Sequence, residues 1–369
     1  MTYGLIGEKL EHSFSKEIHN KLFGYQYELK EIEHEELDAF MKKKNFKAIN
    51  VTIPYKEKVI PYLDFIDETA KNIGAVNTIV NKDGKIFGYN TDFMGMRALI
   101  TKNNISLENK KVLILGSGGT SKTACAVAED LNAKEIFRVS RDGKDGCITY
   151  EDAQNIHADA DVIINTTPCG MYPNINTMAV DIANFPMLSA VVDAVYNPLR
   201  TRIVCDALER GVTAVGGLYM LVAQAAFAAE LFINQSADSD KIDEIYRELF
   251  SQKQNIVLIG MPGSGKTTIG KALSEKLNME FIDTDQKIVD NTNKTIPDIF
   301  AECGEETFRD LENQTIFEVS KKQQSIIATG GGAILRKENV KLLSQNGRIY
   351  FIDRPLSSIV AGHAIIAAF

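Results

Sequence analysis

Cysteine and long apolar runs are scarce in this chain of 369 residues. Its five cysteines are odd in number and form no CxxC pair, so neither a disulfide framework nor a thiolate zinc site is indicated, and a reducing compartment fits. The N-terminal residues contain neither a basic segment nor a long apolar segment, so no export signal is predicted. We therefore expect a cytoplasmic protein.

Positive charge is not in excess either, because the net charge is −8. Binding to a phosphate polymer needs a basic excess, so nucleic acid is not an expected partner. The most apolar stretch, residues 212–233, contains two adjacent glycines as well as Gln224 and Glu230. This favours a loop followed by a buried helix over a membrane span, and no membrane partner is expected.

The composition that is present is typical of a globular protein, with 44% hydrophobic and 24% charged residues. The length suits about two to three domains. Short apolar runs alternate with segments of helical period, which predicts an α/β class with parallel sheets. Polar stretches divide the chain near residue 100 and at a linker of 236–254. Two glycine-rich motifs favour a Rossmann domain over 101–216 and a P-loop domain over 255–369, and residues 1–100, with a return helix at 217–235, form a further α/β domain.

A phosphate-binding loop is the most specific motif. Residues 260–268, GMPGSGKTT, fit the pattern GxxxxGK[ST] between a predicted strand and a predicted helix. Glycines let successive N–H groups face phosphate oxygens, the lysine reaches the β and γ phosphates, and the hydroxyl after it suits Mg²⁺. The motif predicts ATP with Mg²⁺, bound by Gly263, Ser264, Gly265, Lys266, Thr267 and Thr268.

Three features downstream of this loop suggest a second ligand. In FIDTD, alternation along a strand would place Asp283 and Asp285 on one face beside the phosphates. Arg309 follows within a predicted helix, and a later strand leads into Gly330, Gly331 and Gly332, which allow close backbone approach to a small molecule. Each feature has an ordinary alternative, namely a helix cap, a surface charge and a loop.

A second glycine loop lies near the middle of the chain. It matches GxGxxG except for serine at the last position, and it stands between a predicted strand and a predicted helix. The next strand ends near Ser140 and Arg141, where an NAD enzyme would carry an acidic residue. Arg141 and the nearby Lys144 instead favour the 2′-phosphate of NADP, although both could simply be solvated cations. The loop itself is Gly116, Ser117, Gly118, Gly119 and Thr120.

The N-terminal hundred residues supply candidate acid–base chemistry. Ser13 and Ser15 suit an anion, although a helix cap is the commoner use of such serines. Lys56 and Asp92 could form a general acid–base pair, because a carboxylate holds an ammonium group in place. A surface salt bridge is the ordinary alternative.

In order, the segments HSFS, NVTIPYK, GAVNT, GYNTD, GSGGTSK, VSR, NTTPCGM, DAVYNPLRT and GLYMLVAQAA resemble the shikimate dehydrogenase family from residue 3 to about 235. The resemblance implies NADPH-dependent, reversible reduction of 3-dehydroshikimate to shikimate in chorismate and aromatic amino acid biosynthesis, with Lys56 and Asp92 as the catalytic pair. It implies substrate contacts from Ser13, Ser15, Thr52, Asn77, Asp92, Tyr196 and Gln224, pyrophosphate on Gly116 to Thr120, the adenosine phosphate on Ser140 and Arg141, and nicotinamide near Thr166, Gly217 and Met220. In one departure, Ser-Arg-Asp replaces the usual Asn-Arg-Thr, so Asp142 adds a negative charge near the proposed 2′-phosphate.

From residue 255 to about 356, the P-loop, FIDTD, ETFRDLE and ATGGGAI resemble the shikimate kinase family. The resemblance implies that Asp285 and Arg309 bind shikimate with Gly330 to Gly332, and that Asp283 assists Mg²⁺ with Thr267. Only 15 residues follow Arg354, and none of them is an arginine. Because phosphoryl transfer depends on such cations, we expect a C-terminally truncated domain that binds nucleotide and turns over poorly or not at all.

The two resemblances agree on one metabolite, because the product of the first enzyme is the substrate of the second. The expected ligands are shikimate, 3-dehydroshikimate, NADP and Mg²⁺ with ATP. Two alternatives stay open: a quinate/shikimate dehydrogenase that prefers NAD, and a C-terminal part that only binds nucleotide or shikimate. A homodimer is compatible with the sequence, which does not decide the oligomeric state.

Overall fold

The computed structural model describes residues 1–10, 14–355 and 357. The chain divides into two compact units, which are described separately below. Within the described ranges, no helix is both long enough and apolar enough to cross a membrane. The first unit comprises residues 1–169, 178–196 and 206–248, and the second comprises 170–177, 197–205 and 249–369.

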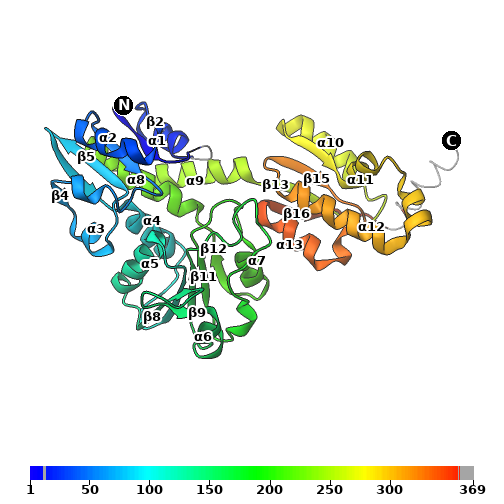
Figure 1. Ribbon diagram of the computed structural model, residues 1–369. Helices are drawn as coiled ribbons and strands as arrows, with labels where there is room; N and C mark the ends of the chain where they lie inside the picture. The colour runs from blue at the N-terminus through cyan, green and yellow to red at the C-terminus, as the bar shows by residue number, and fades with distance from the viewer. Residues whose placement is uncertain (11–13, 356, 358–369) are drawn as a thin grey trace. The chain divides into compact units, whose positions relative to one another are not determined.

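The first sheet of the first unit has the strand order β2-β1-β3-β5-β6-β4 (Figure 1). Strand β1 pairs in parallel with β2 and β3, whereas β5 is antiparallel to both β3 and β6. The strands are β1 (Tyr3–Gly7), β2 (Glu28–Glu31), β3 (Ala48–Val51), β4 (Phe65–Ile66), β5 (Thr78–Lys82) and β6 (Lys85–Tyr89). The helices of this region are α1 (Ser15–Phe23), η1 (His34–Glu36), α2 (Leu37–Lys43), η2 (Ile60–Tyr62), α3 (Glu68–Ile73) and α4 (Thr91–Lys102).

Both faces of this first sheet are covered, which explains why its central strands are apolar at consecutive positions. Successive side chains of a strand point to opposite faces. Ile6 packs into one cluster with Met41 of α2, and its neighbour Leu5 packs into another with Phe232 of α8 (Leu218–Ile233). Figure 1 shows α8 running beside this sheet, although it comes much later in the sequence.

The second sheet of the first unit is entirely parallel, with the order β12-β11-β10-β7-β8-β9. Its inner strands are continuous apolar runs, as expected where helices cover both faces. The strands are β7 (Lys111–Leu115), β8 (Glu135–Ser140), β9 (Ile148–Thr149), β10 (Val162–Asn165), β11 (Ala190–Asp193) and β12 (Thr213–Val215). The helices that accompany it are α5 (Gly119–Asp130), α6 (Tyr150–Asn155), η3 (Ile182–Asn184) and α7 (Arg202–Glu209).

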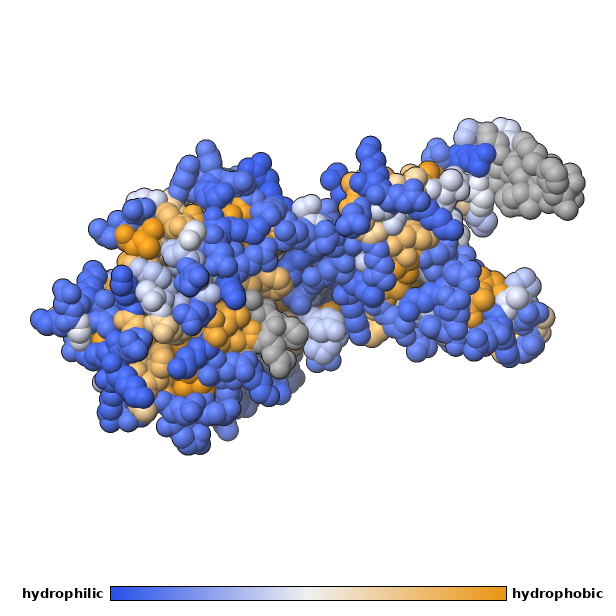
Figure 2. All heavy atoms as spheres, turned by 90° about the horizontal axis from the view of Figure 1, so that it is seen from above, coloured by the Kyte–Doolittle hydropathy of each residue, from blue (hydrophilic) through white to orange (hydrophobic). Residues whose placement is uncertain are grey.

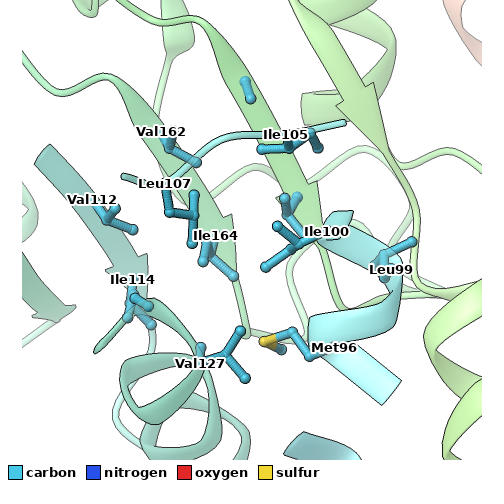
Figure 3. Close-up of a cluster of buried hydrophobic side chains, with 14 of the residues drawn as sticks. Met96, Leu99, Ile100, Ile105, Leu107, Val112, Ile114, Val127, Val162 and Ile164 are labelled. Atoms are coloured by element: carbon cyan, nitrogen blue, oxygen red, sulfur yellow. The ribbon is translucent and has the colours of Figure 1, made fainter. Parts of the chain in front are cut away.

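One core cluster holds this second sheet against helices α4 and α5. Figure 3 shows Val112 and Ile114 of β7 and Ile164 of β10 facing Met96 of α4 and Val127 of α5. All five side chains are 0% exposed. Helix α4 therefore packs on the second sheet even though it directly follows the last strand of the first sheet.

The predicted linker at 236–254 is mostly helical. Helix α9 (Ser239–Lys253) occupies it, and its buried residues Ile242, Ile245 and Leu249 recur at helical spacing. The charged residues between them dominate the composition and hide this stripe. Composition alone therefore identified a polar segment correctly but did not reveal its helix.

The second unit contains a parallel sheet of order β14-β15-β13-β16. Its core includes Val257 and Ile327 from adjacent strands, with Ile316 and Leu342 from helices. In Figure 1 the sheet lies between α10 and α13. The strands are β13 (Asn255–Ile259), β14 (Glu280–Asp283), β15 (Ser325–Ala328) and β16 (Gly347–Phe351). The helices are α10 (Lys266–Leu277), α11 (Thr284–Thr292), α12 (Ile296–Ser320), η4 (Ala333–Leu335) and α13 (Lys337–Asn346).

These three sheets, each accompanied by helices, confirm the predicted α/β class. The surface seen in Figure 2 is mainly hydrophilic, with hydrophobic residues in small separate groups. This distribution is ordinary for a globular protein and marks no broad apolar face in that view.

Candidate active sites

Three predicted substrate residues meet because of the strand directions in the first sheet. Thr52 follows β3, Asn77 precedes β5, and Asp92 lies in the first turn of α4, just after β6. Strand β5 is antiparallel to both neighbours, and its first residue, Thr78, pairs with Asn50 of β3 and Tyr89 of β6. The start of β5 therefore lies beside the ends of β3 and β6.

Lys56 and Asp92 form an ion pair at this edge. The distance from Lys56 Nζ to Asp92 Oδ2 is 2.6 Å, and the two side chains are 22% and 15% exposed. A surface salt bridge, the ordinary alternative, would be much more exposed. Both residues line a cleft of about 480 Å³. The other predicted residues that line this cleft are Ser15, Thr52, Asn77, Thr120, Tyr196, Gly217, Met220 and Gln224.

Asn77 is held in one orientation by a buried network. Its side chain is 3% exposed, and its Oδ1 accepts hydrogen bonds from Thr91 N at 2.7 Å and from Thr78 Oγ1 at 3.1 Å. Because the oxygen is occupied, the amide nitrogen is the group that Asn77 can offer to a ligand. Thr91 Oγ1 also lies 3.5 Å from Gln224 Oε1, which links α4 to α8.

Two further predicted residues border the same cleft from other elements. Ser15 is the first residue of α1, and Tyr196 follows β11. The ring of Tyr196 stands edge-on to Phe14 at 6.0 Å between centroids. Burial raises the pKa of Tyr196, so its hydroxyl remains a hydrogen-bond donor at neutral pH. Ser13 lies outside the described residues.

The dinucleotide loop has the shape that a pyrophosphate requires. Gly116 has φ +119°, and a Cβ there would lie 2.6 Å from Thr166 Oγ1, so a side chain is excluded. Helix α5 begins at Gly119 without a side-chain cap, and a Cβ added at Gly118 or Gly119 would meet nothing within 4 Å. The backbone at Gly118 and Gly119 therefore leaves open space at the start of α5, and an anion is favoured at a helix N-terminus. Ser117 is exposed in the same loop.

The residues predicted to bind the 2′-phosphate lie beside this loop. Gly116 N donates to Val139 O at 2.8 Å, so the end of β8 borders the dinucleotide loop. Ser140 is the last residue of β8 and is 8% exposed, whereas Arg141 and Lys144 are exposed. Both cations are thus placed where an incoming adenosine could meet them.

In the second unit, the P-loop joins β13 to α10. Lys266 is 8% exposed, and its Nζ donates to the carbonyl oxygens of Gly260 at 2.8 Å and Met261 at 2.9 Å. Burial lowers the pKa of Lys266. Gly265 has φ +99° and precedes α10 without a side-chain cap. The predicted loop therefore forms, with Ser264 buried in it and with Thr267 and Thr268 in the first turn of α10.

Asp283 and Asp285 do not leave one face of a strand, so that expectation was wrong. Strand β14 ends at Asp283, and α11 begins at Thr284 because Asp283 caps it, accepting from the backbone N–H groups of Asp285 at 3.1 Å and Gln286 at 3.3 Å. Asp283 also accepts a hydrogen bond from Thr267 Oγ1 at 2.8 Å. The carboxylate of Asp283 therefore both caps α11 and accepts a hydrogen bond from the hydroxyl of Thr267 beside the P-loop.

Asp285, Arg309 and the three glycines do come together. A Cβ at Gly330 would collide with the carboxylate of Asp285, and one at Gly332 would collide with the guanidinium of Arg309. Burial, followed by neighbouring carboxylates, raises the pKa of Asp285 to about 6. Its Oδ1 is buried and has no hydrogen-bond partner among the described residues. A ligand site is expected to contain such a buried polar atom without a partner. The backbone of the three glycines beside it leaves no room for side chains.

A separate cleft of about 610 Å³ lies beside β14. It borders Thr267 and Asp283, but it does not include Lys266, Asp285 or Arg309. The candidate site of the second unit is therefore defined by its side-chain contacts and not by this cleft.

Comparisons with known proteins relate the chain to two enzyme families. Residues 5–79 match the family model of the shikimate dehydrogenase substrate binding domain, and residues 262–363 match that of shikimate kinase. The shikimate dehydrogenase (NADP(+)) of Clostridium perfringens (strain ATCC 13124) is 41% identical over 266 residues, which are 67% of this chain and 97% of the relative. The chain belongs to the shikimate dehydrogenase family. It carries a shikimate kinase domain in its C-terminal part.

Solved structures give the same result for the dehydrogenase. A chorismate mutase/shikimate 5-dehydrogenase fusion protein from Clostridium acetobutylicum is 40% identical, with a TM-score of 0.63, over 67% of this chain and 96% of that one. Shikimate 5-dehydrogenase from Thermus thermophilus, in complex with NADP(H) and shikimate, is 27% identical, with a TM-score of 0.61, over 67% and 99%. The curated shikimate dehydrogenase (NADP(+)) of Methanosphaera stadtmanae is 37% identical over 65% of this chain and 94% of its own.

Sequence reasoning missed several residues of the dehydrogenase cleft and one of the kinase domain. Asn50 lines the cleft and accepts from the Tyr27 hydroxyl at 2.7 Å; an amide inside an apolar strand was a usable signal. Lys9 also lines the cleft, but nothing in its surroundings in the sequence marks it. In the kinase domain Glu312 pairs with Arg309 at 3.0 Å, a contact that helical i, i+3 spacing could have suggested.

We expect the substitution Asp285→Asn to stabilise the kinase domain at neutral pH. The pKa of Asp285 is about 6 in the folded chain against an ordinary 3.8, so the folded state holds the proton more tightly. Stability contributed by this group is therefore present below pH about 4 and is lost as the pH rises to about 6. Removing the charge should raise the free energy of unfolding by about 1–2 kcal/mol at pH 7, after allowance for partial exposure.

Urea unfolding of the full chain at pH 4 and pH 7 checks this prediction. The exposed Asp290, on the same helix α11, supplies the matched control Asp290→Asn. We expect the free energy of unfolding of Asp285→Asn to exceed that of the wild type at pH 7 and to equal it at pH 4. Equal stability of the variant and the wild type at both pH values would contradict the assigned pKa shift.

Proposed function

We propose that the dehydrogenase cleft catalyses the reversible, NADPH-dependent reduction of 3-dehydroshikimate to shikimate. The observation that carries this proposal is the partly buried Lys56–Asp92 pair, at 2.6 Å, in a cleft that Gly217 and Met220 also line. An ammonium group held by a carboxylate is a suitable proton donor to a carbonyl oxygen that gains negative charge. The relatives named above as NADP(+) shikimate dehydrogenases support this assignment.

Each catalytic role follows from the chemistry of the group. NADPH, when bound, supplies the hydride that the ring carbonyl carbon receives. Lys56 donates a proton to the carbonyl oxygen of the substrate, and Asp92 holds and orients the ammonium group. In the reverse direction Lys56 accepts the hydroxyl proton of shikimate. Because the pair lies in a cleft, fewer waters surround it and the attraction within the pair is stronger than it would be in bulk water.

The neighbouring groups suit the remaining functional groups of the ligands. Hydroxyl donors bind a carboxylate well, and amides and hydroxyls bind ring hydroxyls. We assign the substrate carboxylate to Ser13, Ser15 and Tyr196, and the ring hydroxyls to Thr52, Asn77, Asp92 and Gln224. We assign the pyrophosphate of NADP to Gly116 to Thr120, its 2′-phosphate to Ser140, Arg141 and Lys144, and its nicotinamide to the surroundings of Thr166, Gly217 and Met220.

We further propose that the kinase domain binds Mg²⁺ with ATP and shikimate. The P-loop backbone from Gly263 to Thr268 and the buried Lys266 would hold the phosphates, and Thr267 with Asp283 would hold Mg²⁺. The Oδ1 of Asp285, which has no partner in the part of the chain that the structure describes, would bind a ring hydroxyl of shikimate, and Arg309 would bind its carboxylate, against Gly330 to Gly332. The reaction that this arrangement suits is transfer of the γ-phosphoryl group to a shikimate hydroxyl.

A single coupled assay tests both proposals. The full chain is given shikimate, NADP⁺ and Mg²⁺ with ATP, and reduced cofactor and ADP are followed separately. Reduced cofactor formed with shikimate but not with quinate supports the dehydrogenase, whereas no reduction with either acid contradicts it. Shikimate-dependent ADP supports the kinase. ATP binding without ADP formation would instead support the alternative that the C-terminal part is only a binding module.

We propose the same division of the chain as the sequence suggested, with a substrate domain at 1–100 completed by 217–235 and a nucleotide domain at 101–216. The packing of α8 on the first sheet supports it. We also propose a cytoplasmic location, which is supported by the absence of any disulfide among the described residues.

A further inference from the structure

The loop that follows β8 is closed by one hydroxyl and one carboxylate. Ser140 Oγ donates to Asp142 Oδ1 at 3.1 Å and accepts from Gly143 N at 3.1 Å. Gly143 has φ +63°, so the chain turns back at once after Asp142. The hydroxyl of Ser140, which we assign to the 2′-phosphate of NADP, therefore has its only proton engaged by the side chain of Asp142.

Asp142 also contacts Lys144, one of the two cations of this loop. Its Oδ1 accepts from Lys144 N at 3.5 Å, and its Oδ2 lies 3.6 Å from Lys144 Nζ. The hydrogen bond from Ser140, followed by the one from Lys144 N, lowers the pKa of Asp142, so the carboxylate is charged at neutral pH. The side chains of Lys144 and Asp142 are 77% and 58% exposed. This loop thus already contains an anion bound to the donors that a phosphate would use.

An arriving 2′-phosphate must displace this carboxylate and also tolerate its charge. The unphosphorylated ribose of NAD faces neither difficulty, because its hydroxyl groups can donate to the carboxylate. Arg141 is the remaining cation of the loop that Asp142 does not engage in the described contacts. Arg141 therefore favours the binding of NADP, whereas the neighbouring Asp142 favours the binding of NAD.

We propose that Asp142 is a specificity-determining residue that weakens NADP binding and gives this site useful affinity for NAD. It acts by holding the Ser140 hydroxyl and the Lys144 ammonium group, by repelling the 2′-phosphate, and by accepting a ribose hydroxyl of NAD. The proposal rests on the dehydrogenase function proposed above. It adds that the cofactor site serves both cofactors and that one carboxylate sets the balance between them.

The test compares Asp142→Asn with the wild type in the full chain. Calorimetric Kd values for NADP⁺ and for NAD⁺ are measured, together with kcat/KM for shikimate oxidation with each cofactor. Asparagine keeps the size and the acceptor oxygen, so Ser140 can retain its hydrogen bond. We expect NADP⁺ binding to become on the order of tenfold tighter, as a unit charge at contact distance in water allows, and NAD⁺ binding to become about threefold weaker.

Two controls separate this role from a structural one. Glu135→Gln removes the same charge at the opposite end of β8 and should leave the ratio of the two Kd values unchanged. Raising the salt concentration should reduce the difference between Asp142→Asn and the wild type for NADP⁺, because exposed charges are screened. Equal Kd ratios in Asp142→Asn and the wild type would overturn the proposal. Absence of shikimate oxidation would contradict only the proposed function, since the Kd values still report on Asp142.

Discussion

Replacing Lys56 with alanine lowers the turnover of shikimate by at least about a hundredfold, the usual size of a general acid–base contribution. Lys56 Nζ lies 2.6 Å from Asp92 Oδ2, and in the proposed reaction it supplies the only proton that the carbonyl oxygen needs. Alanine leaves Asp92 in the cleft as a carboxylate without its cation. The loss should appear mainly in kcat, because the lysine acts on charge that develops in the transition state.

Steady-state kinetics in both directions check this prediction, with Lys58→Ala as the matched control. Lys58 lies two positions further along the same loop, is exposed, and approaches His34 Nε2 at 3.1 Å without lining the cleft. Its substitution should leave kcat within about twofold of the wild type, as is typical of surface changes away from a site. Near-normal turnover in Lys56→Ala would show that Lys56 is not the proton donor of the reaction.

The second large effect is expected at the P-loop. Replacing Lys266 with alanine should weaken the binding of Mg²⁺ with ADP or ATP by roughly ten- to a hundredfold, the value of a hydrogen bond between charged groups. Lys266 Nζ donates to the carbonyl oxygens of Gly260 and Met261. The ammonium group is therefore already positioned inside the loop, where a phosphate would approach it.

Titration calorimetry of the full chain with Mg²⁺ and ADP measures this effect without requiring kinase turnover. Lys276→Ala provides a control on the last turn of the same helix α10, where the side chain is exposed. Urea unfolding of each variant reports whether the kinase domain remains folded. Unchanged nucleotide affinity in Lys266→Ala would exclude this lysine as a phosphate ligand.

The local structure of the two glycine loops was predicted correctly from the sequence. A glycine loop between a strand and a helix depends on backbone geometry within a few residues, so both loops could be recognised before any fold was known. Gly116 and Gly265 do adopt positive φ angles at the predicted turns. The alternation of apolar runs with helical segments likewise predicted the class correctly, since that pattern follows from the packing of parallel sheets.

Predictions that depended on where a strand ends were less reliable. Asp283 and Asp285 were assigned to one strand, but a side-chain cap on α11 ends the strand at Asp283 and puts Asp285 on a helix. Composition similarly concealed α9 inside the predicted linker. In the first case two hydrogen bonds to Asp283 decide the local structure, and in the second case three buried side chains do so. Such small numbers of contacts barely change the average polarity of a segment, which is what the sequence pattern reports.

The sequence by itself determined the chemistry that is available: two glycine loops that suit phosphate groups, a lysine and an aspartate that suit proton transfer, and an aspartate near the proposed 2′-phosphate site. The tertiary structure alone decided which of these groups meet. Lys56 and Asp92 are 36 positions apart and approach to 2.6 Å because β5 is antiparallel to its two neighbours. The contacts of Asp142 with Ser140 and Lys144, by contrast, lie within five residues and depend on the turn at Gly143. Pairing of strands joins segments that are distant in the sequence, so no local pattern could have shown the contact between Lys56 and Asp92.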